Sequence, residues 1–139
     1  MKLLFENWRK YILNEEVFSS KEIEQIGPNE ITVNTLTTNG GTIVIWEHSP
    51  AAGGVHSIYK FVVDEDKRGL GIGSQLIDAV LGEYPGEEIS GQVSSLASLK
   101  ILHNKGFVNL EAPNATFEEL IELFNKEGES LNMRLKINS

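Results

Sequence analysis

The feature that most constrains the fold is a glycine cluster, Arg68-Gly69-Leu70-Gly71-Ile72-Gly73, between a strand-like and a helix-like segment. Residues 55–63 end in the apolar run Phe61-Val62-Val63, and residues 72–84 have apolar side chains at helical spacing. Glycines at a strand-to-helix turn let backbone N–H groups converge on one point, because no Cβ stands in the way. The first helical turn adds free N–H groups and the positive end of its dipole. The pattern therefore predicts an anion site, and phosphate or pyrophosphate is the natural ligand.

Two common phosphate-binding motifs do not match this cluster. The P-loop requires Lys followed by Ser or Thr after its last glycine, whereas Ser74 and Gln75 follow here. The dinucleotide fingerprint needs a third glycine three residues after the second. That position is Ser74 or Leu76, depending on which glycine is counted first. What remains is the pattern Arg-x-x-Gly-x-Gly, and a glycine turn that serves only tight packing is the plain structural alternative.

The rest of the chain predicts a mixed arrangement of helices and strands. Asn39-Gly40 is a strong signal for a type I′ hairpin turn, in which both central residues have positive φ, between two alternating runs. Strands are predicted over residues 31–37, 42–47, 55–63, 89–93, 107–110 and 131–137. Helices are predicted over residues 4–13, 20–26, 72–84, 95–105 and 117–127, the fourth capped by Ser94 or Ser95 and the last opened by a capping box at Thr116.

This order of elements predicts an α/β fold with a mixed central sheet. Strands separated by helices imply a parallel section, and the tight hairpin adds an antiparallel one. The length of 139 residues suits a single domain over 1–139, with an N-terminal helical segment over 1–29 and the anion-binding core over 55–107.

Composition excludes several classes of function. The formal net charge is −8 with no visible basic face, which argues against a nucleic-acid partner. The absence of cysteine excludes disulfides, thiolate metal sites and a cysteine nucleophile, and we expect no metal site. No apolar run approaches the ~20 residues that span a bilayer. We therefore expect no membrane partner and a cytoplasmic location.

Two segments resemble the GNAT family of N-acetyltransferases. Residues 63–73 are similar to its central motif, Gln/Arg-x-x-Gly-x-Gly/Ala. Residues 101–107, Ile-Leu-His-Asn-Lys-Gly-Phe, are similar to its next motif, a helix that ends in Gly-Phe, and the distance between the two also matches. The resemblance is good over residues 55–107 and loose in the flanks. It implies the acyl-CoA N-acyltransferase fold, a mixed sheet flanked by helices.

The resemblance also implies a site for acetyl coenzyme A as co-substrate. In the family, the strand before the central motif pairs with the pantetheine arm, and the glycine loop wraps the pyrophosphate. Ser95 corresponds to an asparagine that often hydrogen-bonds a carbonyl. The implied cofactor-binding residues are Phe61, Val62, Val63, Arg68, Gly69, Leu70, Gly71, Ile72, Gly73, Ser74 and Ser95.

The positions that carry proton transfer in many family members are changed here. The usual tyrosine corresponds to Leu102, which cannot donate a proton, and a glutamate base corresponds to Ser90. The catalytic residues are therefore unknown. Other candidate acids or bases, each of which also fits a plain surface, strand-end or core role, are Glu47, His48, His56, Tyr59 and His103.

Three functions remain open at this stage. The first is an N-acetyltransferase that moves an acetyl group from acetyl coenzyme A to an amine of an unknown acceptor, a small molecule or a protein. The second is a catalytically weak or inactive acyl-CoA-binding module, and the third is a different α/β domain with another phosphate ligand. The acidic composition mildly favours a cationic partner. The alternating final strand could pair with a second copy, so a homodimer is also open.

Overall fold

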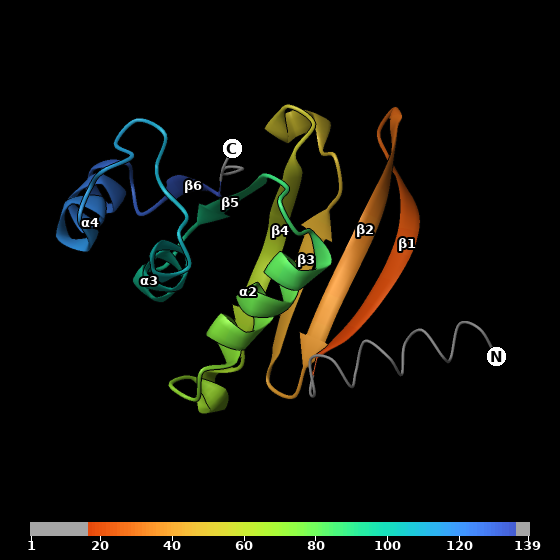
Figure 1. The fold of residues 1–139 in the computed structure, drawn as a ribbon, viewed down its shortest axis with the longest axis horizontal. Helices are drawn as coiled ribbons and strands as arrows, with labels where there is room; N and C mark the ends of the chain where they lie inside the picture. Colours follow the sequence, from red (N-terminus) through yellow and green to blue (C-terminus); the bar gives the residue numbers. More distant parts are fainter. Residues whose placement is uncertain (1–16, 136–139) are drawn as a thin grey trace.

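The computed structural model describes residues 17–135, which form a six-stranded mixed sheet with helices packed against it (Figure 1). The strands lie side by side in chain order, and every neighbouring pair is antiparallel except β4–β5. The strands are β1 (Phe18–Ile26), β2 (Asn29–Thr38), β3 (Gly41–Trp46), β4 (His56–Val63), β5 (Ile89–Val93) and β6 (Leu131–Leu135). The helices are α2 (Ile72–Glu83), α3 (Leu96–Asn104) and α4 (Phe117–Lys126), with 3-10 turns η1 (Pro50–Ala52) and η2 (Glu65–Lys67). The expected α/β fold with a mixed sheet is confirmed.

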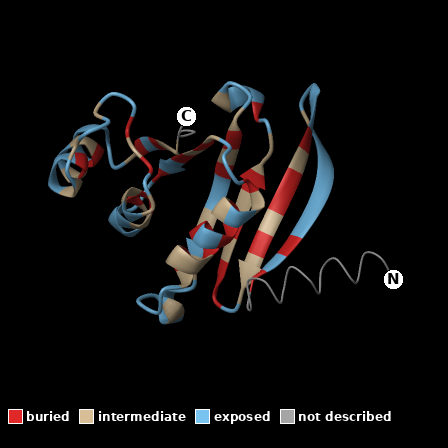
Figure 2. Cartoon of the chain, in the orientation of Figure 1, coloured by how far each residue is buried: buried red, intermediate tan, exposed pale blue. Residues whose placement is uncertain are grey.

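The core lies between the sheet and the helices α2, α3 and α4. Leu76, Ile77 and Val80 are fully buried on one stripe of α2, as their spacing predicts. They belong to the same apolar cluster as Ile43 and Ile45, which alternate along β3. Burial therefore falls in bands along the central strands, whereas β1 at the edge is almost entirely exposed (Figure 2). None of the described helices is long and apolar enough to cross a membrane.

The predicted hairpin at Asn39-Gly40 is confirmed, and it lies against the glycine loop. Its turn is not the expected type I′, because Gly40 has a positive φ but Asn39 does not. Gly40 has φ +106°, a backbone conformation that favours glycine. The Gly40 carbonyl accepts a 2.7 Å hydrogen bond from the Asp64 amide, just after β4. A Cβ at Gly41 would approach Ile72 Cγ2 to 2.9 Å, so the absence of side chains here lets the start of α2 sit close to the hairpin.

The helix predicted over residues 20–26 is wrong, and with it that part of the helical segment predicted over 1–29. These residues belong to β1, which pairs with β2 from Phe18↔Thr37 to Ile26↔Asn29. Serine and glutamates at the start of the segment satisfy helix-start rules, but local signals give way when a long neighbouring strand offers a full ladder of hydrogen bonds. The helix predicted over residues 4–13 lies outside the described residues.

The strand predicted over residues 107–110 is reduced to single bridges. Val108 pairs with Arg134, and Asn109 pairs with Ala112 in a tight turn. The Asn109 side chain accepts from the Ala112 amide and donates to the Asn132 carbonyl, so the chain turns away after one pair. Phe107 is nevertheless fully buried, which explains its apolar character. The last predicted strand is confirmed as β6 as far as Leu135.

A polar clamp ties the edge of the sheet to the end of α2. The Tyr84 hydroxyl donates a 2.7 Å hydrogen bond to Glu47 and accepts one of 2.9 Å from the Asn34 amide group. The Lys21 ammonium lies 2.9 Å from the same Glu47 carboxylate oxygen. Burial would raise the pKa of Glu47, but the hydrogen bonds from Lys21 and Tyr84 outweigh it and hold that pKa below its ordinary value. Burial and the bond to Glu47 raise the pKa of Tyr84 far above its ordinary range, so the phenol keeps its proton.

The lowered pKa of Glu47 makes the clamp weaken in acid. Since the folded pKa lies below the ordinary 4.5, the stabilisation is complete above that value and is lost as pH falls through the folded pKa. Glu47→Gln should cost about 1–2 kcal/mol at pH 7, because a charged hydrogen-bond acceptor is replaced by a neutral one. Thermal unfolding at pH 7 to 3 should show the gap between wild type and variant narrowing. A constant gap, equal to that of the exposed control Glu22→Gln, would contradict the assignment.

Candidate functional site

An opening between β4 and β5 forms where these two neighbouring strands diverge. Their parallel pairing runs only from His56↔Ile89 to Ile58↔Gly91. Beyond that point β5 leaves the sheet direction and pairs with β6, while β4 continues along β3 to Val63, and the divergence is visible in Figure 1. The edge of β4 from Tyr59 to Val63 is therefore left without a β5 partner. Backbone donors and acceptors on such an edge are available to a ligand that lies beside it as a strand would.

A β-bulge at Tyr59 accompanies this parting. Ile58 pairs with Ile45 and Lys60 pairs with Val44, so Tyr59 has no partner on β3. A bulge leaves its extra residue out of the ladder and bends the strand. The backbone of Tyr59 is thus free of the β3 ladder at the point where β4 separates from β5.

The opening between the two strands forms a cavity of about 270 Å³, the splay cavity. One wall is β4 from Ile58 to Val62, and the opposite wall is β5 from Gly91 to Val93. Ser94, Ser98 and Leu102 complete the lining from the start and inner face of α3. Of the sequence-predicted cofactor residues, Phe61 and Val62 line this cavity, and Val63 follows them at the end of β4.

The predicted glycine loop lies at the end of β4 and opens α2, as expected. Gly69 has φ +85° and Gly71, the N-cap of α2, has φ +80°. A Cβ at either position would meet nothing within 4 Å, so the space in front of both is open. The amides of Ile72 and Ser74 precede the first helical hydrogen bond, which Gln75 donates to the Gly71 carbonyl. Open space, free amides and a helix N-terminus together fit a pyrophosphate.

Gly73 has a different role from the two loop glycines. It is buried, and a Cβ there would lie 2.6 Å from Ile101 Cδ1 and 3.3 Å from Phe61 Cζ. This glycine therefore lets α2 approach α3 and β4 closely. The packing alternative raised by the sequence holds for Gly73, while Gly69 and Gly71 face open space.

A second and larger cavity, of about 990 Å³, adjoins the first, and we call it the outer cavity. Its walls come from β3, η1, β4, β5, β6, the segment after Phe107 and α4. Trp46 and Tyr59 lie on its wall with their rings stacked at a centroid distance of 4.1 Å. The sequence signal for this pair was weak, because the two residues lie on different strands and meet only through the β3–β4 register.

The two cavities communicate. Both are lined by Ile58, Tyr59, Gly91, Gln92 and Ser94. A molecule in the outer cavity can therefore reach one held in the splay cavity. This junction coincides with the bulge and with the last β4–β5 pair.

Ser95, which was expected to bind the cofactor, lines neither cavity, whereas its neighbours Ser94 and Ser98 line the splay cavity. Ser95 is the N-cap, and its hydroxyl accepts from the Ser98 amide and donates to the Ser98 hydroxyl. Leu102 is buried and lines the splay cavity with an apolar surface. The splay cavity is thus apolar at Leu102, the residue that the resemblance aligns with a tyrosine.

Of the other candidate acids and bases, Tyr59 alone lines either cavity. Ser90, at the position that the resemblance assigns to a glutamate base, lines the outer cavity. Glu47 is held in the polar clamp, and His103 stacks on Phe117 at a ring distance of 6.0 Å. His56 is buried on the α2 side of β4, with its ring 4.4 Å from that of Tyr84. Glu47, His56 and His103 therefore serve the packing of the fold in this arrangement.

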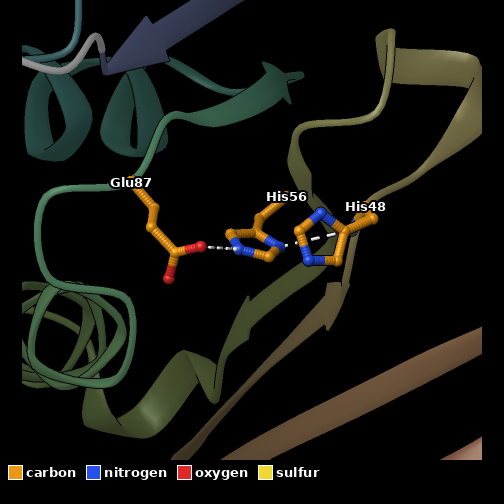
Figure 3. Close-up of side chains that lie close together, drawn as sticks. All are labelled: His48, His56 and Glu87. Carbon is orange, nitrogen blue, oxygen red and sulfur yellow. Dashed lines mark hydrogen bonds and ion pairs between the residues drawn. The ribbon is translucent and has the colours of Figure 1, made fainter.

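One group of three side chains has the composition of a metal site. The ligand-type atoms of His48, His56 and Glu87 lie within 4.8 Å of one another (Figure 3). The His56 Nδ1 accepts a 3.2 Å hydrogen bond from the His48 amide, so this nitrogen carries no proton in the neutral ring. The Nε2–H of His56 is then donated to Glu87 at 2.9 Å. Both nitrogens of His56 are committed, and the ring offers no lone pair to a metal as arranged.

The packing role of Gly73 can be tested by a double-mutant cycle. Gly73→Ala should destabilise by about 1–3 kcal/mol through overpacking, partly offset by helix propensity. Ile101→Val removes the Cδ1 atom that the new methyl would contact and should cost about 1 kcal/mol alone. Denaturant unfolding of the double variant should give a loss smaller than the sum by about 1 kcal/mol or more. Additive losses would show that the two positions do not contact.

Comparison with known proteins identifies the fold. A search of curated proteins found no match. The model of the acetyltransferase (GNAT) family matches residues 23–105, more than half of the chain. This match spans β4, the glycine loop, α2, β5 and α3, which are the elements that build the splay cavity. The chain belongs to the GNAT acetyltransferase family and has its acyl-CoA N-acyltransferase fold.

Proposed function

We propose that the protein is an N-acetyltransferase that moves an acetyl group from acetyl coenzyme A to an amine. The observation that carries the proposal is the splay cavity between β4 and β5, which leads along β4 to the glycine-opened N-terminus of α2. Family membership supports the acyl-CoA dependence, since GNAT proteins are generally acetyltransferases.

In this proposal the cofactor lies along the free edge of β4. The backbone of Phe61, Val62 and Val63 pairs with the pantetheine arm, as an added strand would. The pyrophosphate rests on Arg68, Gly69, Leu70, Gly71, Ile72, Gly73 and Ser74, where free amides and the helix dipole favour negative charge. Ser95 contributes through its position at the start of α3, with its hydroxyl shared between the cap and Ser98.

The acetyl group is assigned to the junction of the two cavities. The amine nitrogen attacks the thioester carbonyl, the carbon–sulfur bond breaks, and the sulfur leaves with the bonding pair. The backbone amide at the Tyr59 bulge, which is left out of the β3 ladder, is the candidate donor to the oxyanion. Leu102 cannot protonate the sulfur, so water in the open junction carries protons, and positioning supplies much of the acceleration.

The acyl-CoA-binding module without turnover is the second candidate. It is favoured by the apolar Leu102 wall and by the absence of Glu47, His48, His56 and His103 from the lining of both cavities. Binding of acetyl coenzyme A is common to both candidates, and turnover separates them.

Gly71→Glu tests the cofactor site. The new carboxylate would stand in the open space in front of the α2 N-terminus and repel the pyrophosphate. Isothermal titration should show micromolar binding of acetyl coenzyme A and coenzyme A to wild type, no binding of ATP or NAD, and at least a 100-fold loss in the variant. Unchanged binding in Gly71→Glu would remove the pyrophosphate assignment.

Gly86→Glu is the matched control. Gly86 has φ +73° and open space around its Cβ position, so the substitution adds similar backbone strain and the same charge at the other end of α2. Its cofactor affinity should stay within about twofold of wild type, because it lies outside the loop. Equal losses in both variants would trace the effect to stability or net charge.

A further inference from the structure

We propose that the stacked pair Trp46–Tyr59 binds positive charge on the acceptor, and that the acceptor is an alkylamine that carries a second cationic group. This inference rests on the proposed acetyl transfer and names the substrate class for it. The group that reacts reaches the junction of the cavities, and the second cation lies on the aromatic faces in the outer cavity.

The pair is built as an exposed platform. The two rings come from adjacent strands and lie nearly parallel, at an interplanar angle of 10°. Tyr59 is 61% exposed, whereas the preceding residue Ile58 and its β3 partner Ile45 are buried on the opposite face of the sheet. A core role for Tyr59 is therefore excluded. The stack fixes the orientation of the Tyr59 ring and leaves aromatic surface open to a ligand.

Its position connects it with the chemistry. Tyr59 lines both cavities, and its own backbone forms the bulge beside the last β4–β5 pair. Trp46 lines only the outer cavity, one strand further from the splay. A ligand group on the rings of this pair is thus displaced from the junction toward β3. An acceptor whose second charge lies on the Trp46 ring therefore extends from the junction to the platform.

The charges of the outer cavity favour a cation. Glu111 and Glu127 line it, and neither carboxylate takes part in an ion pair within residues 17–135. Arg134 is the basic residue of the lining, and its guanidinium lies 3.9 Å from Glu88. The negative faces of aromatic rings attract cations as well, so both kinds of group select the same charge.

The size of the outer cavity narrows the class of acceptor further. The outer cavity measures about 990 Å³, which is at the upper end of small-ligand sites. An amine with a single short chain would leave most of it to water. An aliphatic polyamine and a lysine side chain flanked by other basic groups share the required chemistry: a primary amine with a second positive charge a few bonds away.

A binding experiment tests the platform without any turnover. Hexamethonium carries two quaternary ammonium groups and no transferable N–H, and it is titrated calorimetrically into wild type, Tyr59→Leu, Trp46→Leu and Tyr59→Phe. The affinity should fall about 2- to 30-fold in the two leucine variants, as expected when a cation–π contact is removed. Tyr59→Phe keeps the ring face and should bind within twofold of wild type. No binding to wild type, or equal binding to all four proteins, overturns the proposal.

A kinetic experiment ties the platform to the acceptor. Acetyl transfer to butylamine, 1,4-diaminobutane and a lysine-containing basic peptide is measured for wild type and Tyr59→Leu. We expect kcat/KM to be higher for a dicationic acceptor than for butylamine, and the ratio of these two values should fall toward one in the variant, whatever the change in its rate with butylamine. A higher value for the peptide than for the diamine would assign the acceptor to protein side chains. Equal kcat/KM for butylamine and both dicationic acceptors overturns the proposal.

The two experiments separate failure of this inference from failure of the proposed function. If acetyl coenzyme A does not bind and no amine reacts, the acetyltransferase proposal fails. Hexamethonium binding that depends on Tyr59 would then still establish a cation site. If acetyl coenzyme A binds and turnover occurs without any dependence on Tyr59 or on the second charge, only the platform is wrong.

Discussion

The parting of β4 from β5 after Ile58–Gly91 is the constraint on which the rest of the site depends. A parallel pair this short gives little hydrogen bonding, and the sheet stays together because each strand is satisfied on its other side, β4 by β3 and β5 by β6. Gly91 sits at the point of separation. A Cβ there would approach Ile58 Cδ1 to 3.1 Å, so glycine lets the Ile58 side chain pack directly against the β5 backbone. A continuous β4–β5 ladder would remove both the free edge and the cavity.

The two halves of the split sheet are held by contacts away from the opening. The polar clamp around Tyr84 belongs to the half that contains β1 to β4 and α2. On the other half, the capping box at Thr116 fixes α4, whose Leu120 and Phe124 are buried. Between the halves, Gly73 brings α2 against Ile101 of α3, and Lys105 lies 2.8 Å from Asp78. The Asp78 side chain of that ion pair is 60% exposed, so the pair contributes little to stability. The apolar packing of α2 on α3 therefore contributes more than the ion pair to the fixed spacing of the two halves.

The parts of the fold that could be predicted from sequence are those with local causes. The Asn39-Gly40 hairpin, the glycine loop with α2, and the caps at Ser95 and Thr116 each follow from short-range chemistry. The strand at residues 18–26 was missed because these residues are extended through their pairing with β2. The local sequence pattern does not indicate that pairing.

The candidate site divides in the same way. The place and conformation of the glycine loop could be predicted, because a glycine pattern before a helix carries its own physical meaning. The outer cavity could not, because Trp46 and Tyr59 meet only once a bulge has set the register of β3 and β4. His56 is buried against Tyr84, a contact between residues far apart in the sequence. This candidate base therefore does not line the cleft, which the sequence alone could not indicate.

In the proposed acetyl transfer, the apolar wall at Leu102 leaves rate enhancement to the positioning of the reactants and not to a proton donor at the sulfur. An acid placed at the sulfur would contribute about 10²- to 10⁴-fold, whereas well-oriented reactants can contribute effective molarities of about 10⁵–10⁸ M. A cleft without an acid at the sulfur must depend on the orientation of the reactants. In the proposed arrangement the cofactor is held by backbone groups that any acyl-CoA would satisfy, so the orientation of the acceptor becomes the variable that this chain controls. The groups available for that purpose are the ones on the wall of the outer cavity, where Tyr59, Glu111 and Glu127 gather. Acceptor binding and rate should therefore rise and fall together in this protein.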